Sequence, residues 1–156
     1  MNRGDGSSSK RANKLGLDSD LSSQKSPQNV GEPVGIFVYG TLMRGLKNFH
    51  MAQRAGWWHS SPARIEGYDL YLLPFGYPAI VDGSGQVHGE LQLYRNMTEA
   101  LSVLDPFEDV GRQYERVTAS VWTSDGPRTA WLYRYLNPSQ IERVGGVLEP
   151  SGRYRE

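Results

Sequence analysis

Apolar residues first gather in the segment 35–39, after a long polar leader, and they run directly into Gly40. Four β-branched or aromatic residues before a glycine are typical of a buried strand that ends in a tight loop. Backbone N–H groups can converge beyond such a strand, because glycine permits conformations that other residues avoid. Thr41 adds a hydroxyl group. We therefore expect a loop that can hold an anion, while a glycine that only terminates a strand explains the same residues equally well.

Two segments, 46–56 and 98–107, show the spacing of amphipathic helices. The first carries Phe49 and Ala52 on its apolar face and ends at Gly56. The second can be capped by Asn96 or Thr98. Its apolar face consists of Ala100, Leu101, Leu104 and Phe107. Both segments are predicted to be helical.

Most other patterned segments alternate between apolar and polar residues, as strands do. They are 64–73 with a bulge or bend at Gly67, 78–81, 87–94, 114–123 and 128–136. Pro78 places the short segment 78–81 near a sheet edge, and Asp82-Gly83 predicts a turn after it. The turn 124–127 predicts an antiparallel hairpin. For residues 137–156 we expect a loop with one short ordered turn.

This order of elements predicts an α+β fold, because strands outnumber helices and the hairpin argues against a doubly wound parallel sheet. We expect a mixed, partly closed β-barrel with two helices packed against it. This domain should span residues 34–138, followed by a C-terminal extension over 139–156. Residues 1–33 are dominated by polar and small amino acids. They bury too little apolar surface to offset the entropy of ordering, so we expect a disordered tail.

Composition excludes several classes of function. Seventeen basic residues balance seventeen acidic ones, so nothing favours binding to nucleic acid or an anionic membrane. Cysteine is absent, and His50, His59 and His88 lack the close spacing of a zinc pair, so no metal site is expected. No apolar run reaches membrane-spanning length, and no secretory signal follows Met1. We expect a cytoplasmic protein with a small-molecule partner; no pattern indicates the number of subunits.

Two carboxylates are candidates for chemistry. Glu90 lies on a predicted strand beside Gly89, and it faces either a pocket or a solvated outer surface. Glu108 follows the second predicted helix directly. Partial burial there would raise its pKa towards the range that suits proton transfer. A surface glutamate at a helix end fits the same position.

Six short segments carry a family resemblance when they are taken together and in order. They are 37–45 with Asn48, 77–80, 87–91, 104–108, 114–116 and 130–133. The set resembles the γ-glutamylcyclotransferase-like family, which includes the γ-glutamylamine cyclotransferases and the plant avirulence-induced (AIG2-like) proteins. The resemblance covers residues from about 36 to 135. Near the C-terminus, Arg153-Tyr154 stands where related chains often have a tryptophan.

The resemblance implies an enzyme of lyase or acyltransferase type that needs no metal or organic cofactor. Such an enzyme releases 5-oxoproline and an amine or amino acid from a γ-glutamyl amide. The substrate's own α-amino group attacks its γ-carbonyl, so the protein only has to move a proton and hold the substrate folded. By the family pattern Glu108 moves the proton. The substrate-binding loop is formed by Tyr39, Gly40, Thr41 and Leu42.

Other interpretations stay open. Tyr114 and Arg116 are expected to be structural, with Arg116 paired to Glu90 or Asp105. The chain could be a catalytically inactive module of the same fold that binds a small ligand, because fold does not fix function. A hydrolase with a dispersed Ser/His/Asp set has no supporting local motif. The group that leaves the γ-carbonyl is not indicated by any segment.

Overall fold

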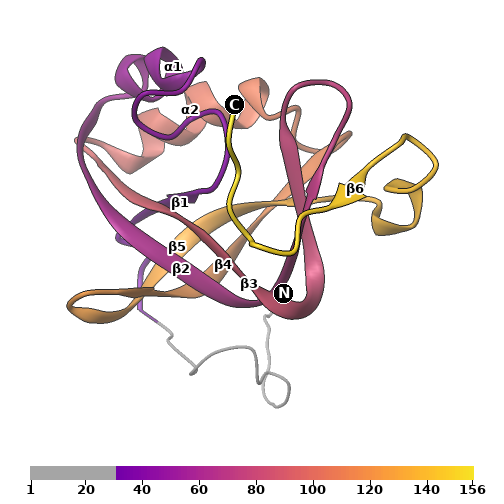
Figure 1. Ribbon diagram of the computed structural model, residues 1–156. Helices are drawn as coiled ribbons and strands as arrows, with labels where there is room; N and C mark the ends of the chain where they lie inside the picture. The colour runs from indigo at the N-terminus through magenta and orange to yellow at the C-terminus, as the bar shows by residue number, and fades with distance from the viewer. Residues whose placement is uncertain (1–30) are drawn as a thin grey trace, which may run out of the picture.

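The computed structural model of the protein describes residues 31–156, so the predicted disordered tail lies outside the described residues except for its last three positions. The elements are shown in Figure 1. In chain order they are β1 (Gly35–Val38), α1 (Phe49–Arg54), β2 (Trp57–Leu72), β3 (Pro78–Tyr94), α2 (Met97–Phe107), β4 (Tyr114–Thr123), β5 (Gly126–Tyr135), the 3-10 helix η2 (Pro138–Gln140) and β6 (Val147–Leu148).

The strands form one mixed sheet whose hydrogen bonding runs round in a ring. Their order is β3-β1-β5-β4-β2-β6, and β2 also pairs with β3. β1 is parallel to β5, whereas its pairing with β3 and the β4–β5 hairpin are antiparallel. Between β2 and β4 the ring is joined at one pair of residues, Arg64 with Trp122. The predicted α+β fold is confirmed, with an irregular ring in place of a clean barrel.

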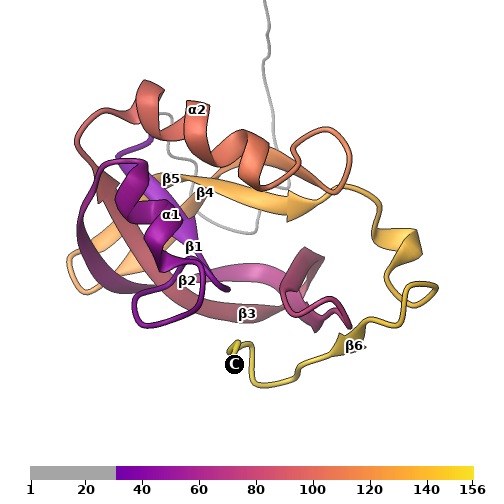
Figure 2. The same ribbon diagram turned by 90° about the horizontal axis from the view of Figure 1, so that it is seen from above.

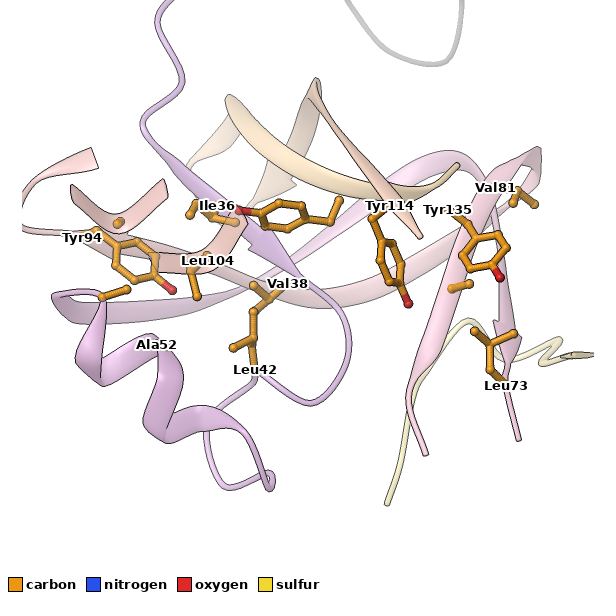
Figure 3. Packing of buried hydrophobic residues seen from close by; sticks show 14 of the residues in the cluster. Ile36, Val38, Leu42, Ala52, Leu73, Val81, Tyr94, Leu104, Tyr114 and Tyr135 are labelled. Carbon is orange, nitrogen blue, oxygen red and sulfur yellow. The ribbon is translucent and has the colours of Figure 1, made fainter. Parts of the chain in front are cut away.

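Two apolar clusters lie on opposite faces of β1. Phe37 and Tyr39 belong to a cluster with residues from β2 to β5, which fills the inside of the ring. Ile36 and Val38 point the other way, into a cluster that includes Ala52 of α1 and residues of α2. The two helices lie on this side of the sheet (Figure 2). Figure 3 shows this second cluster from close by. Because successive side chains of a strand point to opposite faces, β1 contributes residues to both apolar clusters.

The hairpin of β2 and β3 is longer than predicted. β3 is continuous from Pro78 to Tyr94, so the predicted turn at Asp82-Gly83 is wrong. The register shifts where Gly67 of β2, with φ 86°, stands opposite residues 83–85 of β3. The Asp69 carboxylate accepts a hydrogen bond from the Gly85 N–H at 3.0 Å. Asp82-Gly83 is thus part of a β-bulge and not a turn. The predicted bulge or bend at Gly67 is confirmed.

Both predicted helices and the predicted β4–β5 hairpin are present. α1 is followed by Gly56 with φ 98°, as expected for a glycine beyond a helix end. At the start of α2, the Asn96 side chain accepts a hydrogen bond from the Glu99 N–H at 2.9 Å, so Asn96 is the cap. Pro106 lies in the last turn, and Glu108 is the residue at which the helix ends.

The C-terminal residues hold more structure than the single turn predicted for them. η2 supplies that turn, and β6 pairs with the end of β2, placing Leu148 opposite Tyr71. Further on, the Gly152 carbonyl accepts a hydrogen bond from the His88 N–H at 2.9 Å. Long-range pairing, which local patterns do not report, orders this segment. No helix within residues 31–156 is long and apolar enough to cross a membrane.

Candidate active site

A cavity of about 270 Å³ opens between the end of β1, the start of β3 and the end of α2. The sequence-predicted residues Tyr39, Gly40, Thr41, Leu42 and Glu108 all line it. Its wall also includes Asn48, Tyr77, Pro78, Gln113, Tyr114 and Tyr133. The fold therefore brings the predicted loop and the predicted acid to the same cavity.

Gly40, just after β1, lies so close to Pro78 that a side chain on Gly40 would not fit between them. A Cβ atom on Gly40 would lie 2.7 Å from both Cγ and Cδ of the Pro78 ring. Gly40 is not among the glycines with positive φ. The requirement for glycine is therefore one of space, which corrects the expectation that an unusual backbone conformation demanded it.

Three consecutive backbone donors in this loop have no acceptor within residues 31–156. The N–H groups of Gly40, Thr41 and Leu42 donate to no group there. All three residues are buried. Buried backbone N–H groups are nearly always paired, and adjacent unpaired ones form concavities that bind anions. The loop is thus suited to a carboxylate or an oxyanion.

Asn48 holds this loop from behind. Its N–H donates to the Thr41 carbonyl at 3.0 Å, and its side-chain Nδ2 donates to Thr41 Oγ1 at 2.9 Å. The Thr41 hydroxyl is therefore engaged within the protein. The sequence marked Asn48 only as part of the family resemblance, because the contact spans a loop whose path local patterns do not predict.

Glu108 caps the C-terminal end of α2, where its N–H donates to the Leu104 carbonyl at 2.8 Å. Burial raises the pKa of its carboxyl group to about 7. In the part of the chain that the structure describes, no donor lies within hydrogen-bond distance of that carboxyl group. Desolvation is therefore uncompensated, and the group titrates near neutral pH as a proton shuttle must.

Tyrosines surround the carboxyl group. Burial raises the pKa of Tyr39, Tyr114 and Tyr133, and the charge on Glu108 adds to the effect. These hydroxyls therefore stay protonated. The hydrogen bonds run from Tyr39 to the Tyr133 carbonyl (2.6 Å), from Tyr77 to Gln113 Oε1 (2.6 Å), from Tyr114 to the Pro78 carbonyl (2.6 Å) and from Tyr133 to Asp105 Oδ1 (2.8 Å). Sequence reasoning missed Tyr77, Gln113 and Tyr133 as lining residues, since no local motif links them.

The structure places the other candidate residues, Arg116, Tyr114 and Glu90, in different surroundings. Arg116 Nε donates to Asp105 Oδ1 at 2.9 Å, so Asp105 is its partner. Tyr114 lines the cavity in addition to its hydrogen bond with β3. Glu90 lies outside the cavity and accepts a hydrogen bond from the Arg44 N–H at 3.1 Å. Within residues 31–156 no group of three or more His, Asp or Glu side chains is placed to hold a metal ion.

Comparison with known proteins agrees with the fold. The family model described as "Gamma-glutamyl cyclotransferase, AIG2-like" matches residues 36–156, which includes the C-terminal segment. A Vibrio cholerae protein named "Putative gamma-glutamylcyclotransferase" is 40% identical over 112 residues, covering 70% of this chain and 88% of that protein. The crystal structure of an AIG2-like protein from Mus musculus has a TM-score of 0.62 at 22% identity, covering 78% of this chain and 88% of that one.

A solution structure of an Arabidopsis thaliana protein has a TM-score of 0.55 at 25% identity, and the match covers 83% of this chain and 74% of that one. The likeness to the mouse structure bears on the fold alone. The family model is more specific, because it spans the loop residues 39–42, Glu108 and all of the ring of strands except the first residue of β1. The chain belongs to the gamma-glutamyl cyclotransferase, AIG2-like family.

Proposed function

We propose that this protein is a γ-glutamylcyclotransferase that converts a γ-glutamyl amide into 5-oxoproline and a free amine or amino acid. One observation carries the proposal. One cavity is lined by a carboxyl group with a pKa of about 7 and by three consecutive backbone donors that have no acceptor among residues 31–156. Intramolecular aminolysis needs these two features and no protein nucleophile.

In the proposed reaction the substrate's α-nitrogen attacks its γ-carbonyl carbon, and a five-membered lactam ring closes. Glu108, in its carboxylate form, takes a proton from the α-ammonium group. A tetrahedral intermediate forms, with negative charge on the former carbonyl oxygen. Glu108 then returns the proton to the leaving nitrogen, the original amide C–N bond breaks, and the amine departs. The ring nitrogen still carries a second proton from the α-ammonium group, and it releases this proton to the departing amine, which leaves as an ammonium ion. The carboxylate is regenerated, so protons balance over one turnover.

The loop residues Gly40, Thr41 and Leu42 are proposed to bind the substrate's oxygens through their N–H groups. Two acceptors compete for these donors, the glutamyl α-carboxylate and the oxyanion of the intermediate. Donors fixed before the reaction stabilise the oxyanion without reorganisation, and the loss of one such donor typically costs about 10²–10³ in rate. The hydrogen bonds from Asn48 support this role, because they fix the loop independently of any ligand.

Direct detection of 5-oxoproline tests the proposal. The purified full-length protein is incubated with γ-glutamyl-alanine, γ-glutamyl-ε-lysine and a wider panel of γ-glutamyl amides. Formation of 5-oxoproline together with one equivalent of amine is expected for at least one substrate. A panel that yields no product overturns the proposal. Calorimetric binding of the same compounds without turnover would instead identify an inactive ligand-binding module.

A further inference from the structure

A second, wider groove lies beside the substrate loop, on the side of the sheet that the C-terminal segment crosses (Figure 1). It is built from five separate parts of the chain: residues 43–44, β2, β3, the β4–β5 turn and residues 153–155. The Gly152 carbonyl fixes the last of these against His88 on β3. Gly152 suits this contact, since a Cβ atom there would overlap the Gln86 carbonyl and its φ is 68°.

This groove concentrates positive charge in a chain whose net charge is zero. Its lining includes four arginines and a single acidic residue, Glu90. The arginines are Arg44, Arg64, Arg153 and Arg155. Of these, Arg64 has an acidic partner, Glu66, at 3.5 Å. Within residues 31–156 no carboxylate lies within ion-pair distance of the other three guanidinium groups. Positive charge in the groove therefore exceeds negative charge, and within residues 31–156 only Arg64 of the four arginines has an ion-pair partner.

Uncharged hydrogen-bonding side chains also line the groove. It is lined by the hydroxyl groups of Ser61 and Ser124. The Thr123 hydroxyl, which lines it too, donates to the Gly126 carbonyl. The nearby Arg64 and Arg153 guanidinium groups add to the effect of burial in lowering the pKa of His88, so this imidazole stays neutral at pH 7 and can donate or accept. Arginines present paired N–H donors that match the oxygens of phosphate and carboxylate groups.

We propose that this groove binds a small polyvalent oxyanion, a ligand with at least two phosphate or carboxylate groups, held by Arg44, Arg64 and Arg153. Several arginines that line one groove favour a multiply charged ligand over a single carboxylate. The site is distinct from the candidate active site, which contains no arginine among its lining residues. It does not depend on whether the protein has the proposed enzymatic activity.

The groove is connected to the substrate loop through a chain of hydrogen bonds, of which the one that reaches Leu42 is buried. Arg44 N–H donates to Glu90 Oε1 at 3.1 Å, and Gln92 Nε2 lies 3.4 Å from the same oxygen. Gln92 is fully buried and its Nε2 also donates to the Leu42 carbonyl at 3.0 Å. Three hydrogen bonds therefore connect the backbone of Arg44 with the backbone of the substrate loop.

Isothermal titration of the full-length protein with pyrophosphate and with citrate tests the proposal. Saturable binding of one of them is expected, and its affinity should fall as salt is added. Tighter binding of pyrophosphate identifies a phosphate ligand, and tighter binding of citrate identifies a polycarboxylate. The absence of saturable binding for both overturns the proposal.

Matched arginine variants distinguish binding of the anion in this groove from a general attraction of the anion to arginine side chains. Arg44→Gln and Arg153→Gln should each weaken binding roughly tenfold, because each removes a charge-assisted contact. Arg143→Gln removes the same charge from an exposed position outside the groove and should leave the affinity within twofold. Equal weakening by all three variants, or no effect of the groove variants, contradicts the proposal. The circular dichroism spectrum of each variant checks that it is folded.

Discussion

The Glu108 carboxyl group is buried, and residues 31–156 place no hydrogen-bond donor on it, a combination that suits it to proton transfer. Replacement by glutamine keeps the shape and removes the proton-accepting oxygen. We expect Glu108→Gln to lower kcat by about 10²–10⁴ and to change substrate affinity by no more than a few-fold. Glu142→Gln, at an exposed position away from the cavity, is the control. An undiminished rate of 5-oxoproline formation in Glu108→Gln would contradict this role.

The pH dependence of kcat/KM should report the same group. The reactive combination is an ionised Glu108 with a substrate that still carries its α-ammonium proton. Activity should therefore fall below pH 7, where Glu108 becomes protonated, and above roughly pH 8, where the free α-amine loses its proton. Initial rates at low substrate concentration between pH 5 and 10 measure this profile. A flat profile through pH 7 would exclude Glu108 as the base.

Burial of Glu108 also lowers the free energy of unfolding at pH values where the carboxyl group is ionised. Its folded pKa lies above its ordinary value of 4.5, so ionisation is disfavoured in the folded state. Below pH 4.5 the penalty is absent; it grows as pH rises towards 7 and is complete above that. Glu108→Gln should therefore be more stable relative to the natural protein at pH 8 than at pH 4, by up to about 3 kcal/mol. Urea unfolding at both pH values measures the difference, and an equal effect at both contradicts it.

Gly40 offers a test of the substrate loop, whose backbone donors no side-chain deletion can remove. In Gly40→Ala the new Cβ would meet the Pro78 ring at 2.7 Å, so the loop must shift. We expect activity to fall by about 10²–10³, the cost of misplacing an oxyanion donor. The double variant Gly40→Ala/Pro78→Ala removes the obstructing ring carbons and should recover part of the loss. If it recovers none, crowding by Pro78 does not explain the need for glycine.

The helix α2 places Glu108, and one side chain fastens its end to the sheet. Asp105 accepts hydrogen bonds from Arg116 Nε on β4 at 2.9 Å and from the Tyr133 hydroxyl on β5 at 2.8 Å. The Arg116 guanidinium also lies 4.2 Å from the centre of the Trp131 ring. Asp105 thereby couples the helix end to the β4–β5 hairpin.

Asp105→Ala should therefore affect both stability and turnover. We expect a loss of about 1–3 kcal/mol in unfolding free energy, since two hydrogen bonds to a partly buried charge disappear. kcat should fall more than KM rises, because Glu108 is displaced while the substrate loop remains. Asp125→Ala, in the exposed β4–β5 turn, is the control. A variant with lower stability but full kcat would show that the contact stabilises the fold without positioning Glu108.

Elements set by local signals could be predicted from the sequence, as α1, α2 and the β4–β5 hairpin illustrate. The exceptions depend on partners distant in the chain. Asp82-Gly83 resembles a turn, but pairing with β2 converts it into a bulge opposite Gly67. Gln92 is a polar residue of the predicted alternating strand 87–94, yet it is fully buried, because the Leu42 carbonyl and the Tyr94 hydroxyl satisfy its side chain.

The residues that line the cavity also divide into those that could be predicted from the sequence and those that depend on distant parts of the chain. Glu108 and the loop residues were identified through the resemblance, and local chemistry supports both. Tyr77, Gln113 and Tyr133 come from three separate segments and become neighbours only when the ring closes. Their positions therefore depend on the three-dimensional arrangement of strands, which periodicity does not encode.

The ring of strands has one weak join, the single pair of Arg64 and Trp122 between β2 and β4. β4 and β5 are paired along their whole lengths. We expect the join to open before the rest of the sheet, because few hydrogen bonds hold it. Hydrogen exchange followed by mass spectrometry should show faster exchange at residues 120–123 than at 130–133. Slower exchange at 120–123 would place the weakest point of the ring elsewhere.

The three backbone donors at residues 40–42, which have no acceptor in the described part of the chain, have a practical consequence. A compound that fills them binds the folded chain and not the unfolded one, so it must raise the temperature at which the protein melts, by mass action. Heating the protein with a library of glutamyl compounds would thus rank their fit through stability alone. The leaving group of the proposed reaction could be sought in this way before any reaction is assayed.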